Sequence, residues 1–159
     1  MRLIIRYFGE RLYAVIRPVV KTHEDADDVM QETLLKIHSH FDQFQGNSRL
    51  FTWMYRIAYN ESLHFLRKKY RGQHTADFKE ALLQNLRADP WFSGDEIAWK
   101  LEKILTELPE RQAEVFRLKY FSGLKYKEIA GILGISEGAL KTHYHLAVKK
   151  IKSKLSEAD

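Results

Sequence analysis

Residues near the C-terminus carry the pattern best suited to contact with a nucleic acid. From Lys141 to Lys154 the chain has five lysines and neither Asp nor Glu. At the 100° rotation per residue of an α-helix, one side of this stretch is polar and basic. The outward residues are Lys141, Thr142, His145, Leu146, Lys149 and Lys152. Polar side chains near the start of such a helix can reach base edges, while flanking lysines hold phosphates, so the stretch predicts a surface for duplex DNA. The alternative is a solvated basic helix end, since lysines also complement a helix C-terminus.

The residues that precede this surface indicate how it is positioned. Gly134 can take the left-handed conformation that ends a helix, and Ser136 can cap the next helix with its hydroxyl. Ile135 and Leu140 stand where a hydrophobic staple fixes the entry angle of the chain. The first helix has an apolar face made of Ile129, Ala130 and Leu133. This order of a short helix, a tight turn and a longer helix predicts a helix-turn-helix.

A second candidate surface lies on a long helix predicted from about residue 49 to residue 70. Between Arg49 and Arg71 there are six basic residues and one acidic residue. One face of the helix holds Arg49, Trp53, Arg56 and Asn60. Cations interleaved with an aromatic ring and an amide suit unstacked single-stranded bases and their backbone. The alternative for Trp53 is that it is an ordinary core residue.

A third candidate surface lies on the helix predicted to begin at Thr22 or His23. Its outward face carries Asp28, Gln31, Glu32 and Leu35. Leu35 is an apolar residue set among acidic ones, which indicates either a protein contact or a singly exposed leucine.

Composition sets limits on the class of protein. The chain has 159 residues, 45% of them hydrophobic and 30% charged, as in ordinary globular proteins. Its net charge of +5 suits a polyanionic partner, and it has no cysteine for a disulfide or a thiol nucleophile. No apolar run is long enough to cross a bilayer, and charges interrupt the N-terminal apolar run, so we expect neither membrane insertion nor a secretory signal. We expect a cytoplasmic protein.

The apolar periodicity is helical throughout, and no strand pattern or repeat occurs. Residues 73–94 are less regular, with one short helical run at 78–86, and indicate a linker with a transient helix. The predicted fold class is all-α, with two small helical domains joined by a flexible linker and a helix-turn-helix in the C-terminal domain. The predicted boundaries are 1–72, 73–94 and 95–159.

The motifs together resemble those of a known family. Residues 24–33 (EDADDVMQET), 44–48 (FQGNS) and 51–60 (FTWMYRIAYN) resemble region two of bacterial sigma factors. Residues 108–116 (LPERQAEVF) and 123–155 are similar to region four. The order of the regions and the short linker resemble the extracytoplasmic-function group of these RNA polymerase subunits.

The resemblance implies a set of roles. The first domain would bind the beta-prime clamp helices of core RNA polymerase through Asp28, Gln31, Glu32 and Leu35. It would also capture the melted minus-ten element of promoter DNA. The residues implied for that element are Asn47, Ser48, Arg49, Trp53, Arg56, Asn60, Lys68 and Lys69. The second domain would read the minus-thirty-five element with the six outward residues between Lys141 and Lys152 and would touch the beta flap. An anti-sigma protein is a further implied partner, one that would hold the chain at the membrane.

The chain departs from the family pattern at three positions. Lys125 stands where the family often has a serine cap, so the usual cap of the first helix is missing. Leu146 and Val148 stand where arginine is frequent, and Leu146 suits the methyl group of thymine better than guanine.

Two other classes of function are alternatives. An enzyme would need reactive groups in a shared site. Two pairs of histidines are two residues apart, His38 with His40 and His143 with His145. On a helix the two members of each pair point about 200° apart, so they cannot share a metal ion. No phosphate-binding loop or nucleophile-base pair occurs, so we expect no catalytic residue, metal or cofactor. A stand-alone repressor or activator is the other alternative, and it would bind DNA without polymerase.

Overall fold

The computed structural model describes residues 1–92 and 94–157, and within these ranges the chain is helical with no strand. The helices are α1 (Arg2–Val20), α2 (His23–His40), η1 (Phe41–Gln43), α3 (Leu50–Lys69), α4 (Thr75–Ala88), α5 (Glu96–Glu107), α6 (Glu110–Phe116), η2 (Arg117–Phe121), α7 (Tyr126–Leu133) and α8 (Glu137–Glu157). The all-α fold class predicted from the periodicity is confirmed.

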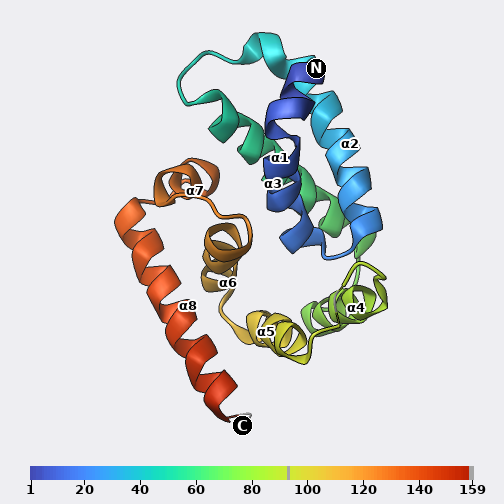
Figure 1. The fold of residues 1–159 in the computed structure, drawn as a ribbon, viewed down its shortest axis with the longest axis vertical. Coiled ribbons are helices and arrows are strands. Elements are labelled where there is room, and N and C mark those ends of the chain that lie inside the picture. Colours follow the sequence, from blue (N-terminus) through green and yellow to red (C-terminus); the bar gives the residue numbers. More distant parts are fainter. Residues whose placement is uncertain (93, 158–159) are drawn as a thin grey trace.

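Helices α1, α2 and α3 pack together as the N-terminal half of the molecule (Figure 1). Each helix turns one apolar stripe toward the others, as the 3.6-residue period requires. Fully buried side chains from all three helices fill the core, among them Leu12, Ile16, Ile37, Met54 and Tyr55. Phe41 follows Ile37 at the four-residue spacing of the apolar stripe, but the chain leaves α2 there and its side chain is exposed.

The corner between α1 and α2 is tight. Pro18 lies in the last turn of α1, which ends two residues later, as expected of a proline that cannot continue a helix. Lys21 has a φ of +76°, and the N–H of Thr22 donates to the carbonyl oxygen of Val20 at 3.0 Å, which closes a γ-turn around Lys21. The hydroxyl of Thr22 accepts the N–H of Asp25 at 3.2 Å and caps α2, which begins at His23.

The segment after α3 is more ordered than the sequence indicates. In place of a transient run at 78–86, α4 spans 14 residues and buries Leu82, Leu83 and Leu86. Because these leucines pack against neighbouring helices, tertiary contacts stabilise a helix that is weak on its own.

The C-terminal half is built from α5 to α8. Its core brings together apolar residues of three helices, including Ile104, Leu105, Phe116, Ala147 and Ile151. Ile97 lies four residues before Leu101, a spacing that fits the buried stripe of α5, but its side chain is 67% exposed.

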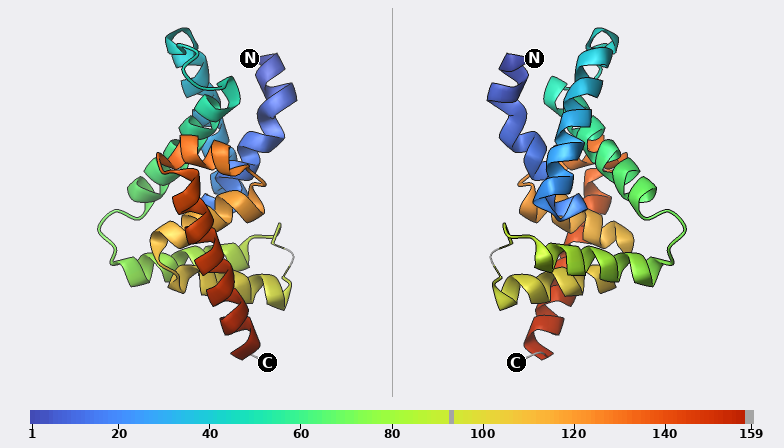
Figure 2. Two further views of the ribbon diagram at one scale, coloured as in Figure 1. Left: turned by 90° about the vertical axis from the view of Figure 1, so that its left-hand side faces the viewer. Right: turned by 90° about the vertical axis from the view of Figure 1, so that its right-hand side faces the viewer.

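The two halves pack against each other along α3 and α7 and along α1 and η2. Figure 2 shows α7 crossing α3 in both side views, with α8 running away from the N-terminal helices. The two termini therefore lie at opposite ends of the long axis.

Candidate nucleic-acid interface

The turn between α7 and α8 has the geometry predicted for a helix-turn-helix. Gly134 ends α7 with a φ of +70°, and its N–H donates to the carbonyl oxygen of Ala130 at 2.9 Å. The hydroxyl of Ser136 accepts the N–H of Ala139 at 3.2 Å and caps α8. Ile135 packs against the core that contains the buried Leu140, in agreement with the predicted staple. These contacts fix the direction in which α8 leaves the turn.

The start of α7 compensates for the loss of the usual cap at Lys125. The carboxylate of Glu128 accepts the backbone N–H of Lys125 at 2.9 Å, so the helix is capped by a residue of its own first turn. Glu128 is buried, and its other oxygen lies 3.4 Å from the guanidinium of Arg11 in α1. A single carboxylate thus both caps α7 and links it to the N-terminal half.

All six residues predicted to face duplex DNA lie on the exposed side of α8. Lys141, Thr142, His145, Leu146, Lys149 and Lys152 are exposed, while Leu140, Ala147 and Ile151 are buried. At 100° per residue the six side chains span an arc of about 140° around the helix axis, so a single side of α8 carries all of them. Leu146 is 38% exposed, an accessible apolar side chain among polar ones.

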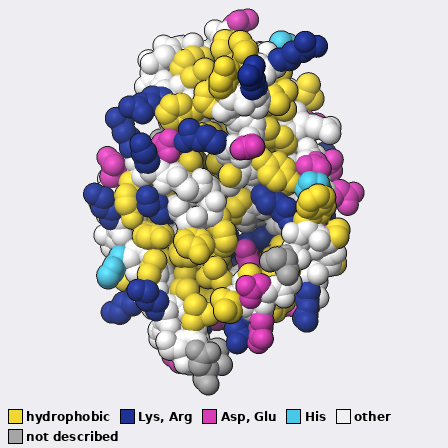
Figure 3. Space-filling view, viewed as in Figure 1, with side chains coloured by type: hydrophobic (Ala, Val, Ile, Leu, Met, Phe, Trp, Pro, Cys, Tyr) yellow, Lys and Arg dark blue, Asp and Glu magenta, His cyan; other side chains and the backbone are white. Residues whose placement is uncertain are grey.

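Basic side chains also gather around this part of the molecule. Figure 3 shows Lys and Arg side chains along the edge where α7 and α8 lie. Lys141 approaches the ring of Tyr126 at 5.8 Å, which holds its flexible side chain beside the turn. The concentration of positive charge on one edge favours contact with a polyanion.

The predicted single-strand surface on α3 is partly assembled. Arg56 and Asn60 are exposed on α3, and Arg49 is exposed at its N-terminus. Trp53 is half-buried, with its ring 5.4 Å from that of Phe44. It therefore packs in part, as its core alternative requires, and stays partly exposed.

The loop before α3 brings further predicted residues nearby. Asn47 is exposed, and its amide donates to Gln45 at 3.2 Å, while Ser48 is half-buried. At the other end of the helix Lys68 is exposed. These residues flank the two ends of the helix that carries Arg56 and Asn60.

Lys69 has a partner within the chain. Its ammonium group lies 2.6 Å from a carboxylate oxygen of Asp25 in α2. Burial lowers the pKa of Lys69, but the hydrogen bond and the charge of Asp25 outweigh this effect and raise the pKa above its ordinary value. Lys69 stays charged, and part of its charge is neutralised before any contact with DNA.

The predicted polymerase face on α2 is accessible. Asp28, Gln31, Glu32 and Leu35 are all exposed, and Leu35 is 63% exposed. The first three line a shallow groove between α2 and α3, together with His64 and Lys68. The acidic face of α2 and the basic end of α3 therefore border one another.

The sequence did not indicate one set of contacts near these surfaces. Arg56 donates from Nε to the carbonyl oxygen of Gly131 in α7 at 2.9 Å. Tyr59, three residues further along α3, donates its hydroxyl to Glu114 in α6 at 2.6 Å, and burial together with this carboxylate raises the pKa of Tyr59. Partners 75 and 55 residues away leave no local signal in the sequence.

Neither a metal site nor a membrane span is found in the part of the chain that the structure describes. No group of three or more His, Asp or Glu residues there could hold a metal ion. None of the described helices combines the length and apolar character needed to cross a bilayer.

A helix-turn-helix in one half and a helix rich in basic and aromatic residues in the other are typical of promoter-binding transcription proteins. Comparison with family models matches sigma-70 region 2 to residues 4–72 and sigma-70 region 4 to residues 98–151. The RNA polymerase sigma factor YlaC of Bacillus subtilis is 30% identical over 158 residues, which cover 96% of this chain and 90% of that protein. The sigma-E factor of Escherichia coli, of the extracytoplasmic-function group, is 26% identical over 163 residues that cover 96% of this chain and 84% of that protein.

Solved structures agree with this assignment. CnrH, in complex with the cytosolic domain of CnrY, is 25% identical with a TM-score of 0.67 over 99% of this chain and 87% of that chain. RpoE of Bartonella quintana, in complex with the anti-sigma factor NepR, shares the fold with a TM-score of 0.70 and 24% identity over 98% of this chain and 96% of that chain.

The chain belongs to the sigma-70 family of bacterial RNA polymerase sigma factors, in the extracytoplasmic-function group. It is therefore a subunit that joins core RNA polymerase and directs promoter recognition, promoter melting and transcription initiation. The stand-alone regulator, an alternative on sequence grounds, is not favoured by these matches.

Proposed function

We propose that α8 reads the minus-thirty-five element as duplex DNA. Lys141, Thr142, His145 and Leu146 would contact base edges in the major groove, and Lys149 and Lys152 would contact phosphates. One observation carries this assignment: the six side chains share one exposed side of a helix whose direction is fixed by the capped turn at Gly134 and Ser136.

The residues on and around α3 would hold the melted minus-ten strand. The set is Asn47, Ser48, Arg49, Trp53, Arg56, Asn60, Lys68 and Lys69. Exposed cations on α3, the partly exposed ring of Trp53 and the amide of Asn60 support it, since unstacked bases stack on aromatic rings beside a basic surface. Lys69 is the least available member because Asp25 already binds it.

Core polymerase would be held at two places. The exposed face made by Asp28, Gln31, Glu32 and Leu35 would contact the beta-prime clamp helices, and the C-terminal half would contact the beta flap. In this assignment residues 1–72 and 95–159 act as the two binding domains, and residues 73–94 connect them.

A sigma factor of this kind would act in the cytoplasm as a non-catalytic subunit, with an anti-sigma protein as a further partner. The support comes from two relatives, since CnrH is described in complex with the cytosolic domain of CnrY and RpoE of Bartonella quintana with the anti-sigma factor NepR. Such a partner could hold the chain near the membrane.

Transcription by reconstituted holoenzyme tests the role of α3. Asn60→Ala should reduce initiation on duplex promoters about tenfold, because a base contact contributes about 1–3 kcal/mol. On a template melted in advance around the minus-ten element, the loss should be smaller. Gln84→Ala removes an exposed amide from α4 and serves as the matched control, with unchanged initiation on both templates. Equal losses for Asn60→Ala on both templates would contradict a role in melting and capture.

A further inference from the structure

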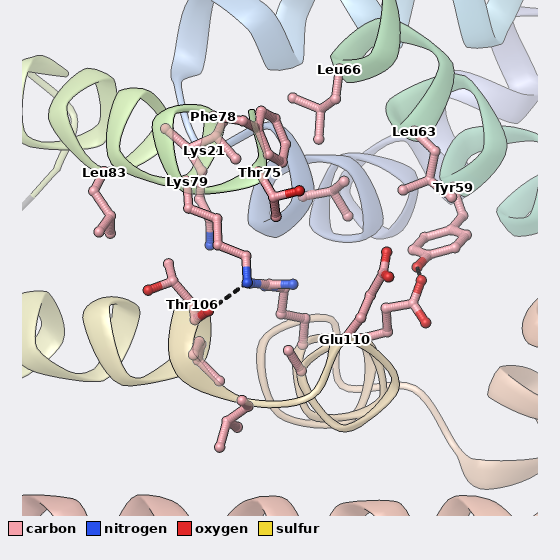
Figure 4. A pocket seen from close by; sticks show the side chains of 17 residues that line it. Lys21, Tyr59, Leu63, Leu66, Thr75, Phe78, Lys79, Leu83, Thr106 and Glu110 are labelled. Carbon is pink, nitrogen blue, oxygen red and sulfur yellow. Dashed lines mark hydrogen bonds between the residues drawn. The ribbon is translucent and has the colours of Figure 1, made fainter. Parts of the chain in front are cut away.

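A largely apolar cavity of about 360 Å³ lies where α3, α4, α5 and α6 meet (Figure 4). Thr75 and Glu110 border the cavity and are exposed, so it opens to solvent beside them. Most of its wall is hydrocarbon, contributed by residues that include Leu63, Leu66, Phe78, Leu82 and Leu105. Small-molecule sites in proteins have volumes of about 300–1,000 Å³ and mostly apolar walls. The cavity is therefore suited in size and lining to a small ligand.

Three basic side chains, Lys21, Lys79 and Arg117, line the same cavity. Lys21 is 4% exposed, and its ammonium group forms an ion pair with Glu102. The ammonium group of Lys79 donates to the carbonyl oxygen of Thr106 at 2.8 Å. Because a carbonyl is a neutral acceptor, this bond leaves the charge of Lys79 uncompensated.

Arg117 has even fewer partners. Its Nε is buried without a hydrogen-bond partner, and its guanidinium belongs to none of the ion pairs in the part of the chain that the structure describes. The charge of Arg117 also helps to lower the pKa of Lys21, so the two cations repel each other. An anion placed between them would relieve this repulsion.

The acidic groups at the cavity do not neutralise these cations. Glu114 accepts the hydroxyl of Tyr59 at 2.6 Å, and its other oxygen lies 3.1 Å from the guanidinium of Arg111. Glu110 is exposed at the mouth, where water and salt screen its charge. Figure 4 shows Glu110 and Tyr59 across the cavity from the two lysine side chains. One side of the cavity therefore keeps a net positive charge.

We propose that this cavity binds a small amphipathic anion, an aliphatic monocarboxylate, with its carboxylate on Arg117 and Lys79 and its alkyl chain among the leucines of α3 and α4. A guanidinium can hold a carboxylate through two parallel hydrogen bonds, and the alkyl chain leaves water for an apolar wall. None of the residues assigned above to DNA or to polymerase lines the cavity. The site is therefore separate from those contacts.

Other ligand classes fit this cavity less well. A metal ion would need a cluster of acidic or histidine ligands, and no such cluster occurs among the described residues. An amine would meet the same repulsion that Lys21 and Arg117 exert on each other. A carboxylate with no alkyl chain would leave the apolar wall unused.

Calorimetric titration of the full chain with sodium octanoate tests the site. At about pH 7 Lys21 is mostly charged, because its pKa is about 8. We expect one octanoate per chain, and affinity should rise about fourfold for each CH₂ added between butanoate and octanoate. Octylamine has the same alkyl chain with the opposite charge and should bind at least about tenfold more weakly than octanoate.

Arg117→Gln should weaken octanoate binding at least about tenfold, because it removes the guanidinium and leaves the leucines in place. Lys79→Gln should weaken it about threefold and provides a second variant from a different helix. Arg87→Gln is the matched control, since Arg87 is an exposed arginine of α4 that does not line the cavity. Its affinity for octanoate should equal that of the wild type.

Thermal unfolding of each variant without ligand shows whether it is folded. Octanoate should then raise the Tm of the wild type and of Arg87→Gln more than that of Arg117→Gln, because a ligand stabilises the state that binds it. Absence of binding at about 1 mM octanoate would overturn the site. Equal affinity for octylamine, or unchanged octanoate affinity in both Arg117→Gln and Lys79→Gln, would overturn the assignment of the carboxylate to these cations.

Discussion

The carboxylate of Asp89 lies 2.7 Å from the guanidinium of Arg17 and ties the connecting segment to the end of α1. The same oxygen accepts the backbone N–H of His23 at 2.7 Å, and the other oxygen accepts the N–H of Trp91 at 3.0 Å. Because His23 opens α2, its N–H has no partner within the helix. One buried side chain thus joins α1, the start of α2 and the segment before α5.

Asp89→Asn should lower the free energy of unfolding by about 1.5–3 kcal/mol, since hydrogen bonds to a charged group are lost or weakened in a buried place. Chemical denaturation of the purified chain measures this change. Asp95→Asn is the control: Asp95 caps α5 from an exposed position, and asparagine caps as well as aspartate, so we expect a change within about 0.5 kcal/mol. Equal effects of the two substitutions would show that the Arg17 contact contributes little.

Lys21 predicts a pH dependence of stability. Burial, followed by the charge of Arg117, lowers the pKa of Lys21 to about 8 from an ordinary 10.5, although Glu102 acts in the opposite direction. Between pH 8 and 10.5 the unfolded chain therefore binds more protons than the folded chain, so the contribution of Lys21 to stability rises with pH in this window. Below about pH 8 that contribution is constant and unfavourable.

The test compares unfolding at about pH 8 and about pH 9.5 for wild type and Lys21→Met. Wild type should gain roughly 1.5 kcal/mol relative to the variant over this interval, because Lys21 of the folded chain is already half deprotonated at about pH 8 and the full slope is about 1.36 kcal/mol per pH unit. Lys103→Met changes an exposed lysine of the neighbouring α5 and should follow the wild-type pH dependence. If the free energy of unfolding changes with pH in the same way for wild type and Lys21→Met, the pKa of Lys21 is the same in the folded and unfolded chain.

Leu35→Asp should weaken binding to core polymerase at least about tenfold, because it places a charge where an exposed apolar side chain would be buried on the partner. Its helix should stay intact, since the side chain is exposed in the free chain. Leu3→Asp is the matched control, as Leu3 is a leucine of α1 that is 67% exposed. Binding can be measured by competition with a labelled sigma factor, and normal competition by Leu35→Asp would place the contact elsewhere.

On α8 we expect base contacts and phosphate contacts to respond differently. His145→Ala should change the preference at one position of the minus-thirty-five element by about 1–3 kcal/mol. Lys149→Ala should weaken binding to all sequences by a similar factor. It should also reduce by about one the slope of log affinity against log salt concentration. A promoter library randomised at this element, transcribed by holoenzyme with each variant, separates the two behaviours. The reverse pattern would require a different rotation of α8.

Local signals predicted much of the structure. Gly134 and Ser136 indicated the turn because a left-handed residue and a side-chain cap act over one or two residues. The exposed side of α8 followed from the helical period. Arg56 shows where this reasoning stops, since its partner Gly131 is 75 residues away and the bond depends on how two complete halves pack.

The connecting segment shows a second limit. Residues around Leu82 have a weak helical pattern, and only their burial among neighbouring helices extends α4 to 14 residues. Ile97 shows the converse, because its spacing fits the buried stripe of α5 but its side chain is exposed. In both cases tertiary packing overrides the local pattern. The assigned DNA and polymerase contacts themselves remain predictions.

The order of the helices along the chain has a consequence for biosynthesis. The contacts among α1, α2 and α3 all lie within the first 69 residues, whereas the residues that cover α3 come from α6 and α7. At about 5–20 residues per second, the ribosome needs roughly 3–13 s to add the 64 residues that follow Lys69 up to Leu133. During that interval the N-terminal helices can fold while the stripe of α3 that later contacts α6 and α7, including Arg56 and Tyr59, is still exposed to solvent.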